Sequence, residues 1–277
     1  MKVALVHDFL LEFGGAERVL EAVHEVWPEA PIYTAFLDEN RLGSHWERLR
    51  DWEIRTSWGQ RVPGLRALHS PLRFMAPLYF ESFDLSSYDV VISSSNMYQA
   101  KAVITRPETL HICYCHTPPR SLYGYTTRVD WRSHWWSRWY GEVVNFKMRQ
   151  VDFLTAQRPD VIVANSQETQ RRIKKFWRRD SVVIYPPVQL QATSYKLQAE
   201  NSGSYFLYVG RLAGAKRVDL AVKAANELGL PLKVVGSGGG ESYLRQIAGK
   251  TVEFLGSVED DKLAQLYAGC KAVVFPA

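Results

Sequence analysis

Short apolar runs recur along the chain, and most are followed by a polar loop and a stretch with helical spacing. Apolar, often β-branched runs bounded by turn residues predict buried strands of a parallel sheet. In the first two thirds of the chain such strands are expected at 2–6, 31–36, 52–56, 89–93, 110–115, 160–164 and 181–185. The alternation of strands with helices predicts an α/β fold built on Rossmann-like, doubly wound parallel sheets.

The last third of the chain repeats this pattern after a change in composition. Strands are expected at 205–209, 231–235, 251–255 and 271–275, with helices at 216–228, 240–248 and 259–269. Residues 189–203, which precede these elements, are polar and weakly patterned, as is typical of a connection between domains. We therefore predict an N-terminal domain at 1–188, a linker at 189–203 and a C-terminal domain at 204–277.

One segment of the first domain has an unusual composition. Residues 131–180 hold eleven Lys or Arg against five Asp or Glu, together with five of the nine tryptophans. Bulky residues recur there at helical spacing, with Arg138 and Lys147 mostly on other faces; they are Trp135, Trp136, Trp139, Val143, Phe146, Phe153 and Leu154. Tryptophan prefers membrane interfaces and basic side chains are attracted to anionic lipid, so one interpretation is a membrane-binding helix. The other is that the tryptophans belong to the core.

The overall composition excludes several classes of protein. With 46% hydrophobic residues, a net charge of +5 and no apolar run as long as a membrane span, the chain is predicted to be a globular protein of the cytoplasm. Three cysteines do not make a disulfide framework. Cys113, Cys115 and His116 are too few ligands for a closed zinc site, so we expect cysteines buried in a strand.

The stretch 205–219 carries the clearest functional signal. A buried strand ends at Gly210, and the helical pattern begins again at Val218 after a loop of small residues. Arg211 then follows the strand, and Lys216 and Arg217 lie near the first turn of the helix. Basic side chains oppose the helix dipole at that end, so their presence around unpaired N–H groups favours a bound anion, and a diphosphate best. The alternative is a basic surface turn.

Two other loops follow strands of the first domain, where ligands bind in doubly wound sheets. Gly14 and Gly15 separate the first strand from the first helix, but they form neither a dinucleotide fingerprint nor a P-loop. Their alternative role is a tight turn that needs glycine dihedral angles. His116 leaves the strand at 110–115 directly before Thr-Pro-Pro, and its alternative role is a hydrogen bond within its own loop.

These segments resemble those of retaining GT-B glycosyltransferases of family four. The resemblance rests on Gly210-Arg-Leu-x3-Lys-Arg-x-Asp-Leu-Ala-Val-Lys-Ala224, on Tyr114-Cys-His-Thr-Pro-Pro-Arg120 and on Gly14-Gly-Ala-Glu17. It implies a GT-B architecture, in which two Rossmann-like domains bind a nucleotide diphosphate sugar. It also implies that neither a metal nor another cofactor is needed, because fixed cations stabilise the departing diphosphate.

The resemblance also implies a role for each residue of the site. Arg211 and Lys216 would bind the donor diphosphate, with Gly14 and Gly15 facing its phosphates. His116 would be the catalytic residue beside the transferred sugar. The residues near the base of the nucleotide would be Gly236, Ser237 and Gly238, for which a flexible turn is the alternative.

Two features depart from the family pattern. The donor-phosphate loop has Ala213-Gly-Ala215 where the family usually has a proline. The sequence stops at Ala277, before the Glu-x7-Glu segment that in the family grips the sugar and ribose of the donor. We therefore expect an incomplete second domain and a chain that, as a fragment, binds nucleotide weakly, aggregates and lacks transferase activity.

The expected function is transfer of a hexose, mannose or glucose, with retention, from a nucleotide diphosphate sugar to a membrane-associated glycan or lipid-linked acceptor. The setting would be cell-surface polysaccharide biosynthesis at the inner face of the cell membrane, with no nucleic acid partner. Two rivals stay open. One is a non-hydrolysing nucleotide-sugar epimerase of GT-B fold, which needs no acceptor. The other is a non-catalytic module that binds polyanions through residues 131–180.

Overall fold

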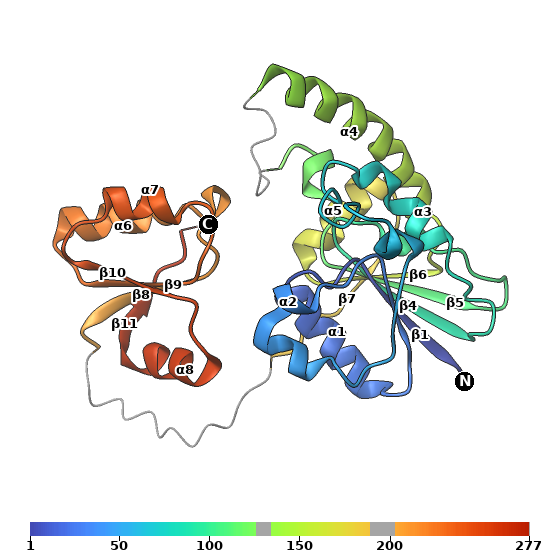
Figure 1. Ribbon diagram of the computed structural model, residues 1–277, viewed down its shortest axis with the longest axis horizontal. Helices are drawn as coiled ribbons and strands as arrows, with labels where there is room; N and C mark the ends of the chain where they lie inside the picture. Colours follow the sequence, from blue (N-terminus) through green and yellow to red (C-terminus); the bar gives the residue numbers. More distant parts are fainter. Residues whose placement is uncertain (126–133, 189–202, 277) are drawn as a thin grey trace. The chain divides into compact units, whose positions relative to one another are not determined.

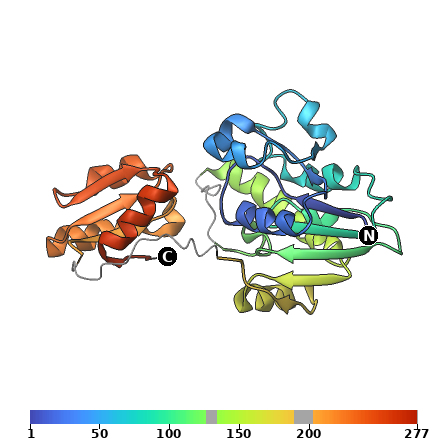
Figure 2. The same cartoon turned by 90° about the horizontal axis from the view of Figure 1, so that it is seen from below.

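A computed structural model describes residues 1–125, 134–188 and 203–276, which form two compact units (Figure 1). Among the described residues, unit 1 runs up to residue 188 and unit 2 comprises 203–276. Each unit contains a parallel sheet with helices on both faces (Figures 1 and 2). The predicted fold class, two α/β domains with doubly wound parallel sheets, is therefore confirmed. The predicted linker lies outside the described residues, except for Gly203.

The sheet of unit 1 has seven parallel strands in the order β3-β2-β1-β4-β5-β6-β7. All the strands expected in this part of the chain are present, although several are shorter than their apolar runs. Their bounds are β1 (Val3–His7), β2 (Ile32–Thr34), β3 (Ile54–Thr56), β4 (Val90–Ser95), β5 (Leu110–Cys115), β6 (Val161–Ala164) and β7 (Val182–Val183). The order reverses between β1 and β4, which makes the carboxyl ends of these two strands the switch point of the sheet.

The two faces of this sheet bury different side chains, because successive side chains of a strand point to opposite faces. On one face, Leu5 of β1 packs with Leu20 of α1 (Gly15–Val26). On the other, Val6 packs with Phe80 of α3 (Ala76–Glu81), and Cys113 of β5 packs with Trp177. In Figure 1, α1 and the short α2 (Glu39–Leu42) lie on one side of the sheet. The helices on the other side are α3, α4 (Trp135–Thr155) and α5 (Gln167–Trp177).

Unit 2 has four parallel strands in the order β10-β9-β8-β11. They are β8 (Tyr205–Val209), β9 (Leu232–Val235), β10 (Val252–Gly256) and β11 (Cys270–Val273). On one face, Tyr208 packs against α6 (Val218–Leu228) and α7 (Glu241–Ile247), and on the other Leu207 packs against α8 (Asp260–Gly269). The order reverses between β8 and β11, so these neighbours form the switch point of the second sheet.

A buried ion pair holds the inner side of α4 in unit 1. Lys101 and Asp152 are 1% and 0% exposed, and Nζ of Lys101 donates to Oδ1 of Asp152 at 2.6 Å. The other oxygen, Oδ2, accepts from the Tyr123 hydroxyl and from Nε1 of Trp177, each at 2.6 Å. Burial raises the pKa of Asp152, but the charge of Lys101 and these hydrogen bonds outweigh it, so the pKa lies below its ordinary value.

The outer side of α4 exposes the aromatic residues that helical spacing placed together. Trp135, Trp136 and Trp139 are 83%, 60% and 69% exposed. The buried residues of the helix are Gly141, Val144, Asn145, Met148, Asp152 and Thr155. The interpretation of these tryptophans as core residues is therefore wrong, because α4 turns its smaller side chains toward the sheet. No helix in the described residues is both long and apolar enough to cross a membrane.

Candidate functional site

Polar side chains gather at the switch point of unit 1, where the central strands end. His7 is the last residue of β1, Ser94 lies near the end of β4 and His116 follows β5 directly. Glu17 reaches the same place from the first turn of α1. Parallel pairing of β1 with β4 and of β4 with β5 brings these residues together. The cluster therefore occupies the edge of the sheet where doubly wound proteins bind ligands.

These four residues form a continuous chain of hydrogen bonds, which we call the His116 network. Oγ of Ser94 lies 3.0 Å from Nδ1 of His7 and 2.9 Å from Nε2 of His116. Nε2 of His7 lies 3.3 Å from Oε1 of Glu17. The other carboxylate oxygen, Oε2, accepts from the Gly14 N–H at 2.8 Å. The glycine loop is therefore connected to His116 through three buried side chains.

Burial controls the charge of this network. The pKa of His116 is lowered to about 4, chiefly by burial, while the nearby Glu17 acts in the opposite direction. His116 is consequently a neutral imidazole near neutral pH. Burial raises the pKa of Glu17, but the hydrogen bonds from His7 and from the Gly14 N–H outweigh it, so the pKa lies below its ordinary value and Glu17 is a carboxylate.

The glycine loop leaves open space beside this network. Gly14 has a φ of −146° and Gly15 begins α1, and neither residue has a positive φ. A Cβ at Gly15 would meet nothing within 4 Å, and one at Gly14 would meet the Glu17 carboxylate at 3.4 Å. The alternative that this turn needs glycine dihedral angles is therefore not supported. The missing side chains instead leave room at the N-terminus of α1.

Asp8 anchors the segment that follows β4. Its carboxylate is buried and accepts three backbone hydrogen bonds, from Asn96 and Tyr98 at Oδ2 and from Ala100 at Oδ1, at 2.9, 2.8 and 2.8 Å. Three bonds to one carboxylate hold this segment against the end of β1. The residues between Ser94 and Ala100 are therefore positioned by the strand that carries His7.

In unit 2, the loops after β8 and β9 interlock at the carboxyl edge of the sheet. The Leu212 N–H donates to the Ser237 carbonyl at 2.9 Å. Gly236 has a φ of +126°, and a Cβ there would lie 2.0 Å from the carbonyl oxygen of Gly210. Gly238 has a φ of +158°, and its Cβ would lie 2.5 Å from the Leu212 oxygen. Both glycines are therefore required by the contact between the two loops.

The predicted cations lie on this edge. Arg211 is exposed and follows Gly210, and Lys216 ends a short 3-10 turn before α6. Nζ of Lys216 lies 4.8 Å from the centroid of the Phe275 ring, which follows β11. Because β8 and β11 are the neighbours between which the strand order reverses, this contact places the Lys216 ammonium group at the switch point.

The structure differs from the predicted anion site in two details. Arg217 pairs with Asp219 in the first turn of α6, with nitrogen–oxygen distances of 3.1 and 3.2 Å. The N–H groups of Lys216 and Arg217 donate to carbonyls of their own turn, at 2.8 and 3.2 Å. The expectation of three cations around unpaired N–H groups is therefore wrong for Arg217 and for these two amides, because the turn before α6 satisfies them internally.

The sequence pattern points to His116 but predicts no role for His7, Glu17 or Ser94. A signal was present, since polar residues end or directly follow three of the expected strands of the first domain. The spacing along the chain does not show that these ends are adjacent, because adjacency depends on the strand order.

Residues 13–192 match the sequence profile described as Glycosyltransferase Family 4. The chain belongs to this family. Residues 192–277 of the glycosyltransferase also match the profile described as Glycosyl transferases group 1. No curated protein sequence matches the chain.

Solved structures share the fold of this family 4 glycosyltransferase. Anabaena Alr3699/HepE in complex with UDP aligns at a TM-score of 0.63 and 16% identity, over 99% of this chain and 73% of that chain. An alpha-glucosyltransferase (AGT) in complex with UDP aligns at 0.55 and 11% identity, over 99% and 72%. A glycosyltransferase from Rickettsia africae ESF-5 aligns at 0.52 and 11% identity, over 100% and 74%. The GT-B fold expected from the resemblance is thereby confirmed.

Proposed function

We propose that this glycosyltransferase transfers a hexose, glucose or mannose, from a nucleotide diphosphate sugar to a glycan or lipid-linked acceptor, with retention of configuration. The observation that carries the proposal is the position of Lys216 at the carboxyl edge between β8 and β11, with Arg211 on the same loop. Strand ends at a switch point bind nucleotides in doubly wound sheets, and paired cations suit a diphosphate. Neither a metal nor another cofactor takes part in the proposed transfer.

The donor we propose to test first is UDP-glucose. The structures of HepE with UDP and with UDP and glucose, and that of AGT with UDP, support a uridine nucleotide. GDP-mannose is the second donor to test. Gly236, Ser237 and Gly238 would lie near the nucleotide base, because their loop contacts the one that carries Arg211. Gly14 and Gly15 would leave space for the phosphates at the N-terminus of α1, and His116 would contact the sugar.

Nucleotide binding tests the role of Lys216. A cation and a phosphate about 4 Å apart attract each other by up to ~4 kcal/mol before desolvation. After that cost, Lys216→Ala should weaken the binding of UDP by at least about 1.5 kcal/mol, or roughly tenfold in Kd. Lys223→Ala is the matched control, because Lys223 is exposed on α6 and lies outside the proposed site. Calorimetry that finds equal affinity in the Lys216 variant and the wild type contradicts the assignment.

Turnover tests the reaction itself. The full-length protein is incubated with each labelled donor, with and without a lipid-linked acceptor fraction, and free nucleotide and labelled glycan are measured. Transfer requires that both products appear together and depend on the acceptor. NMR of the new glycosidic bond then decides between retention and inversion. A sugar nucleotide converted to its epimer without any acceptor would contradict transfer and favour the epimerase.

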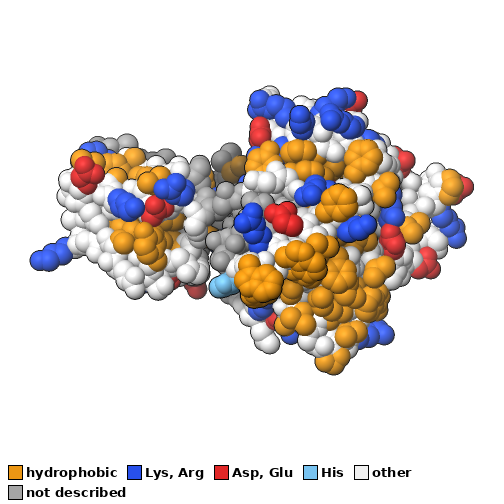
Figure 3. Space-filling model, turned by 90° about the horizontal axis from the view of Figure 1, so that it is seen from above, with side chains coloured by type: hydrophobic (Ala, Val, Ile, Leu, Met, Phe, Trp, Pro, Cys, Tyr) orange, Lys and Arg blue, Asp and Glu red, His pale blue; other side chains and the backbone are white. Residues whose placement is uncertain are grey.

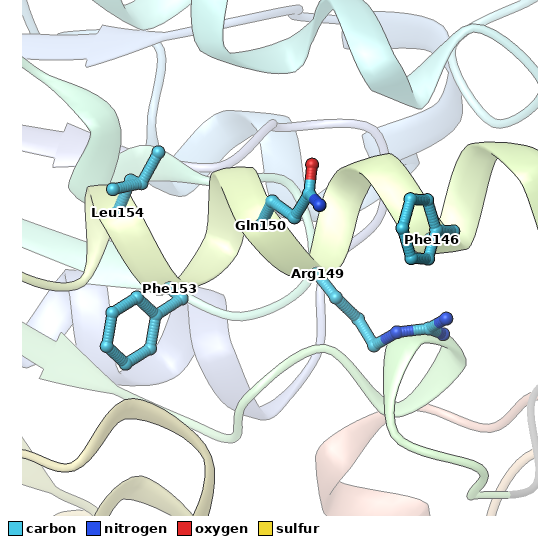
Figure 4. Close-up of a pocket in the computed structure, with 5 residues that line it drawn as sticks. All are labelled: Phe146, Arg149, Gln150, Phe153 and Leu154. Atoms are coloured by element: carbon cyan, nitrogen blue, oxygen red, sulfur yellow. The ribbon is translucent and has the colours of Figure 1, made fainter.

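The exposed side of α4 is proposed as a surface that attaches to an anionic membrane, where a lipid-linked acceptor would be found. Figure 3 shows hydrophobic side chains gathered on this side of unit 1, with Lys and Arg among them. Exposed hydrophobic residues continue along the helix to Phe153 and Leu154, and the stretch with Phe146 and Arg149 is shown in Figure 4. Large exposed apolar surfaces rimmed by basic residues are typical of interfacial helices.

Vesicle sedimentation tests this surface. Each Lys or Arg near an anionic bilayer adds about 1 kcal/mol of attraction, so Arg138 and Lys147 should make binding depend on anionic lipid. Replacing Trp135, Trp136 and Trp139 by Ser should reduce pelleting with anionic vesicles, whereas Trp58→Ser, at a site 41% exposed outside α4, should not. Equal pelleting with neutral and anionic vesicles contradicts the proposal. Salt-sensitive binding to soluble polyanions that ignores nucleotide sugars would favour the non-catalytic module.

A further inference from the structure

We propose that Glu17, His7 and Ser94 are positioning residues that fix the tautomer of His116, so that Nε2 carries the proton and Nδ1 presents a lone pair to a substrate hydroxyl group. The inference rests on the proposed function, because it concerns the residue that would contact the sugar. It follows from the hydrogen-bonding capacity of each group in the His116 network, taken in order from the glycine loop.

Glu17 sets the direction in which the hydrogen bonds of the His116 network are donated. Glu17 is 7% exposed, and its carboxylate has no proton to donate, so both oxygens act as acceptors. Oε2 accepts from the Gly14 N–H, and Oε1 faces Nε2 of His7 at 3.3 Å. Nε2 of His7 must therefore carry a proton. A charge-assisted bond to a carboxylate is usually about 2.7–2.9 Å long, and at 3.3 Å this contact requires no more than the single proton on Nε2.

A neutral His7 with a proton on Nε2 has a lone pair on Nδ1. Ser94 is then the donor to this atom, across 3.0 Å. A hydroxyl group has one proton, so Oγ of Ser94 can only accept from its second partner, Nε2 of His116 at 2.9 Å. Since His7 and Ser94 are 2% and 6% exposed, water does not readily replace either partner.

His116 is the last residue of the hydrogen-bond network. Its neutral ring donates through Nε2 and is left with a lone pair on Nδ1. Among the described residues, none forms a hydrogen bond with this atom, and the ring is partly exposed. Nδ1 is therefore suited to accept a hydrogen bond from a hydroxyl of the substrate. The direction of the hydrogen bonds at Ser94 decides that Nδ1 is an acceptor. A protonated His7 would still donate to Glu17, but it would also donate to Ser94, which would then donate to Nε2 of His116 and make Nδ1 of His116 the donor.

The tautomer is measured directly by NMR on protein labelled with ¹⁵N-histidine, near neutral pH. Two-bond ¹H–¹⁵N correlations show which ring nitrogen carries the proton, and the loss of signals in His116→Gln assigns the ring. We expect the wild type to have the proton on Nε2 of His116. A proton on Nδ1 in the wild type overturns the proposal.

Glu17→Gln is expected to reverse the direction of the hydrogen bonds that Ser94 forms in the His116 network. The amide has one acceptor and one donor group, and its oxygen is needed by the Gly14 N–H, so its NH₂ faces Nε2 of His7. His7 must then move its proton to Nδ1, Ser94 must donate to His116, and His116 must carry its proton on Nδ1. Glu21→Gln is the matched control on the same helix, because Glu21 pairs with Arg48 at 2.9 Å and is not part of the network.

A double variant tests whether the effect passes through Ser94. In a Ser94→Ala background, Glu17→Gln should leave the His116 signals unchanged. In the full-length protein, Glu17→Gln alone should lower kcat by at least about tenfold, with the Kd for UDP within about threefold of wild type, because a wrong tautomer affects turnover more than binding. A tautomer that does not change in Glu17→Gln overturns the proposal. A tautomer that changes as expected, in an enzyme whose turnover survives His116→Ala, leaves the network in place and contradicts only the proposed role of His116.

Discussion

Removal of the buried cation in unit 1 provides a sharp test of what holds α4 in place. In Lys101→Met, Asp152 keeps its hydrogen bonds from Tyr123 and Trp177 but loses the 2.6 Å bond from Nζ. The Nζ contact with the Trp177 ring, 4.8 Å from its centroid, is lost as well. Methionine fills most of the space of the lysine chain, so the change isolates the charge from the packing.

The expected loss follows from burial. Breaking a buried ion pair by removing one partner costs about 3–5 kcal/mol, because an uncompensated charge remains in the interior. The control is Lys174→Met, since Lys174 pairs with Asp180 at the same distance of 2.6 Å but both side chains are exposed, at 62% and 91%. An exposed pair is worth about 0–1 kcal/mol, so the same substitution should be nearly neutral there.

The loss of stability in Lys101→Met should also depend on pH in a definite direction. In the wild type the folded pKa of Asp152 is depressed, so its contribution to stability is present above the unfolded pKa and is lost as the pH falls through the folded pKa. Without Lys101, the two largest contributions that oppose burial are lost, so we expect the folded pKa of Asp152 to rise above its unfolded value. The variant therefore carries its largest penalty near neutral pH. That penalty is relieved as the pH falls and Asp152 takes up a proton.

Urea unfolding followed by tryptophan fluorescence is the assay. All nine tryptophans lie between residues 27 and 177, so the signal reports unit 1 and not unit 2. A free energy of unfolding within about 1 kcal/mol of the wild type near neutral pH would refute the reasoning. So would a difference between Lys101→Met and the wild type that stays constant as the pH is lowered to about 5.

Three further outcomes are expected. Gly236→Ala should destabilise unit 2 by at least about 2 kcal/mol, because its Cβ would lie 2.0 Å from a carbonyl oxygen. Gly239→Ala, which has open space around the Cβ, should be nearly neutral, and hydrogen exchange of the β8 and β9 amides compares the two variants. Asp8→Ala should cost unit 1 about 3 kcal/mol or more by leaving three amides without their acceptor, which urea unfolding measures. His116→Ala should slow transfer in the full-length protein while the Kd for UDP stays within about threefold; lost affinity with normal turnover would reverse its role.

Much of the candidate site in unit 2 could be predicted from the local sequence. Arg211 and Lys216 follow an apolar strand and precede a helix, and this order alone places them at a sheet edge. The pairing of Arg217 with Asp219 was not foreseen, although the two residues are close in the sequence. A short-range ion pair and a ligand compete for the same guanidinium group, and only the geometry of the turn decides between them.

The sequence by itself determined the order of strands and helices, because a strand buried on both faces needs a continuous apolar run and a helix needs its own period. Tertiary structure decided which side of α4 is buried. Asp152 can be buried only against a partner, and its partner Lys101 lies 51 residues away. Tertiary structure also assembled the His116 network. Ser94 is 87 residues from His7 and 22 from His116, and only the parallel pairing of β4 with both β1 and β5 brings these side chains within hydrogen-bond distance.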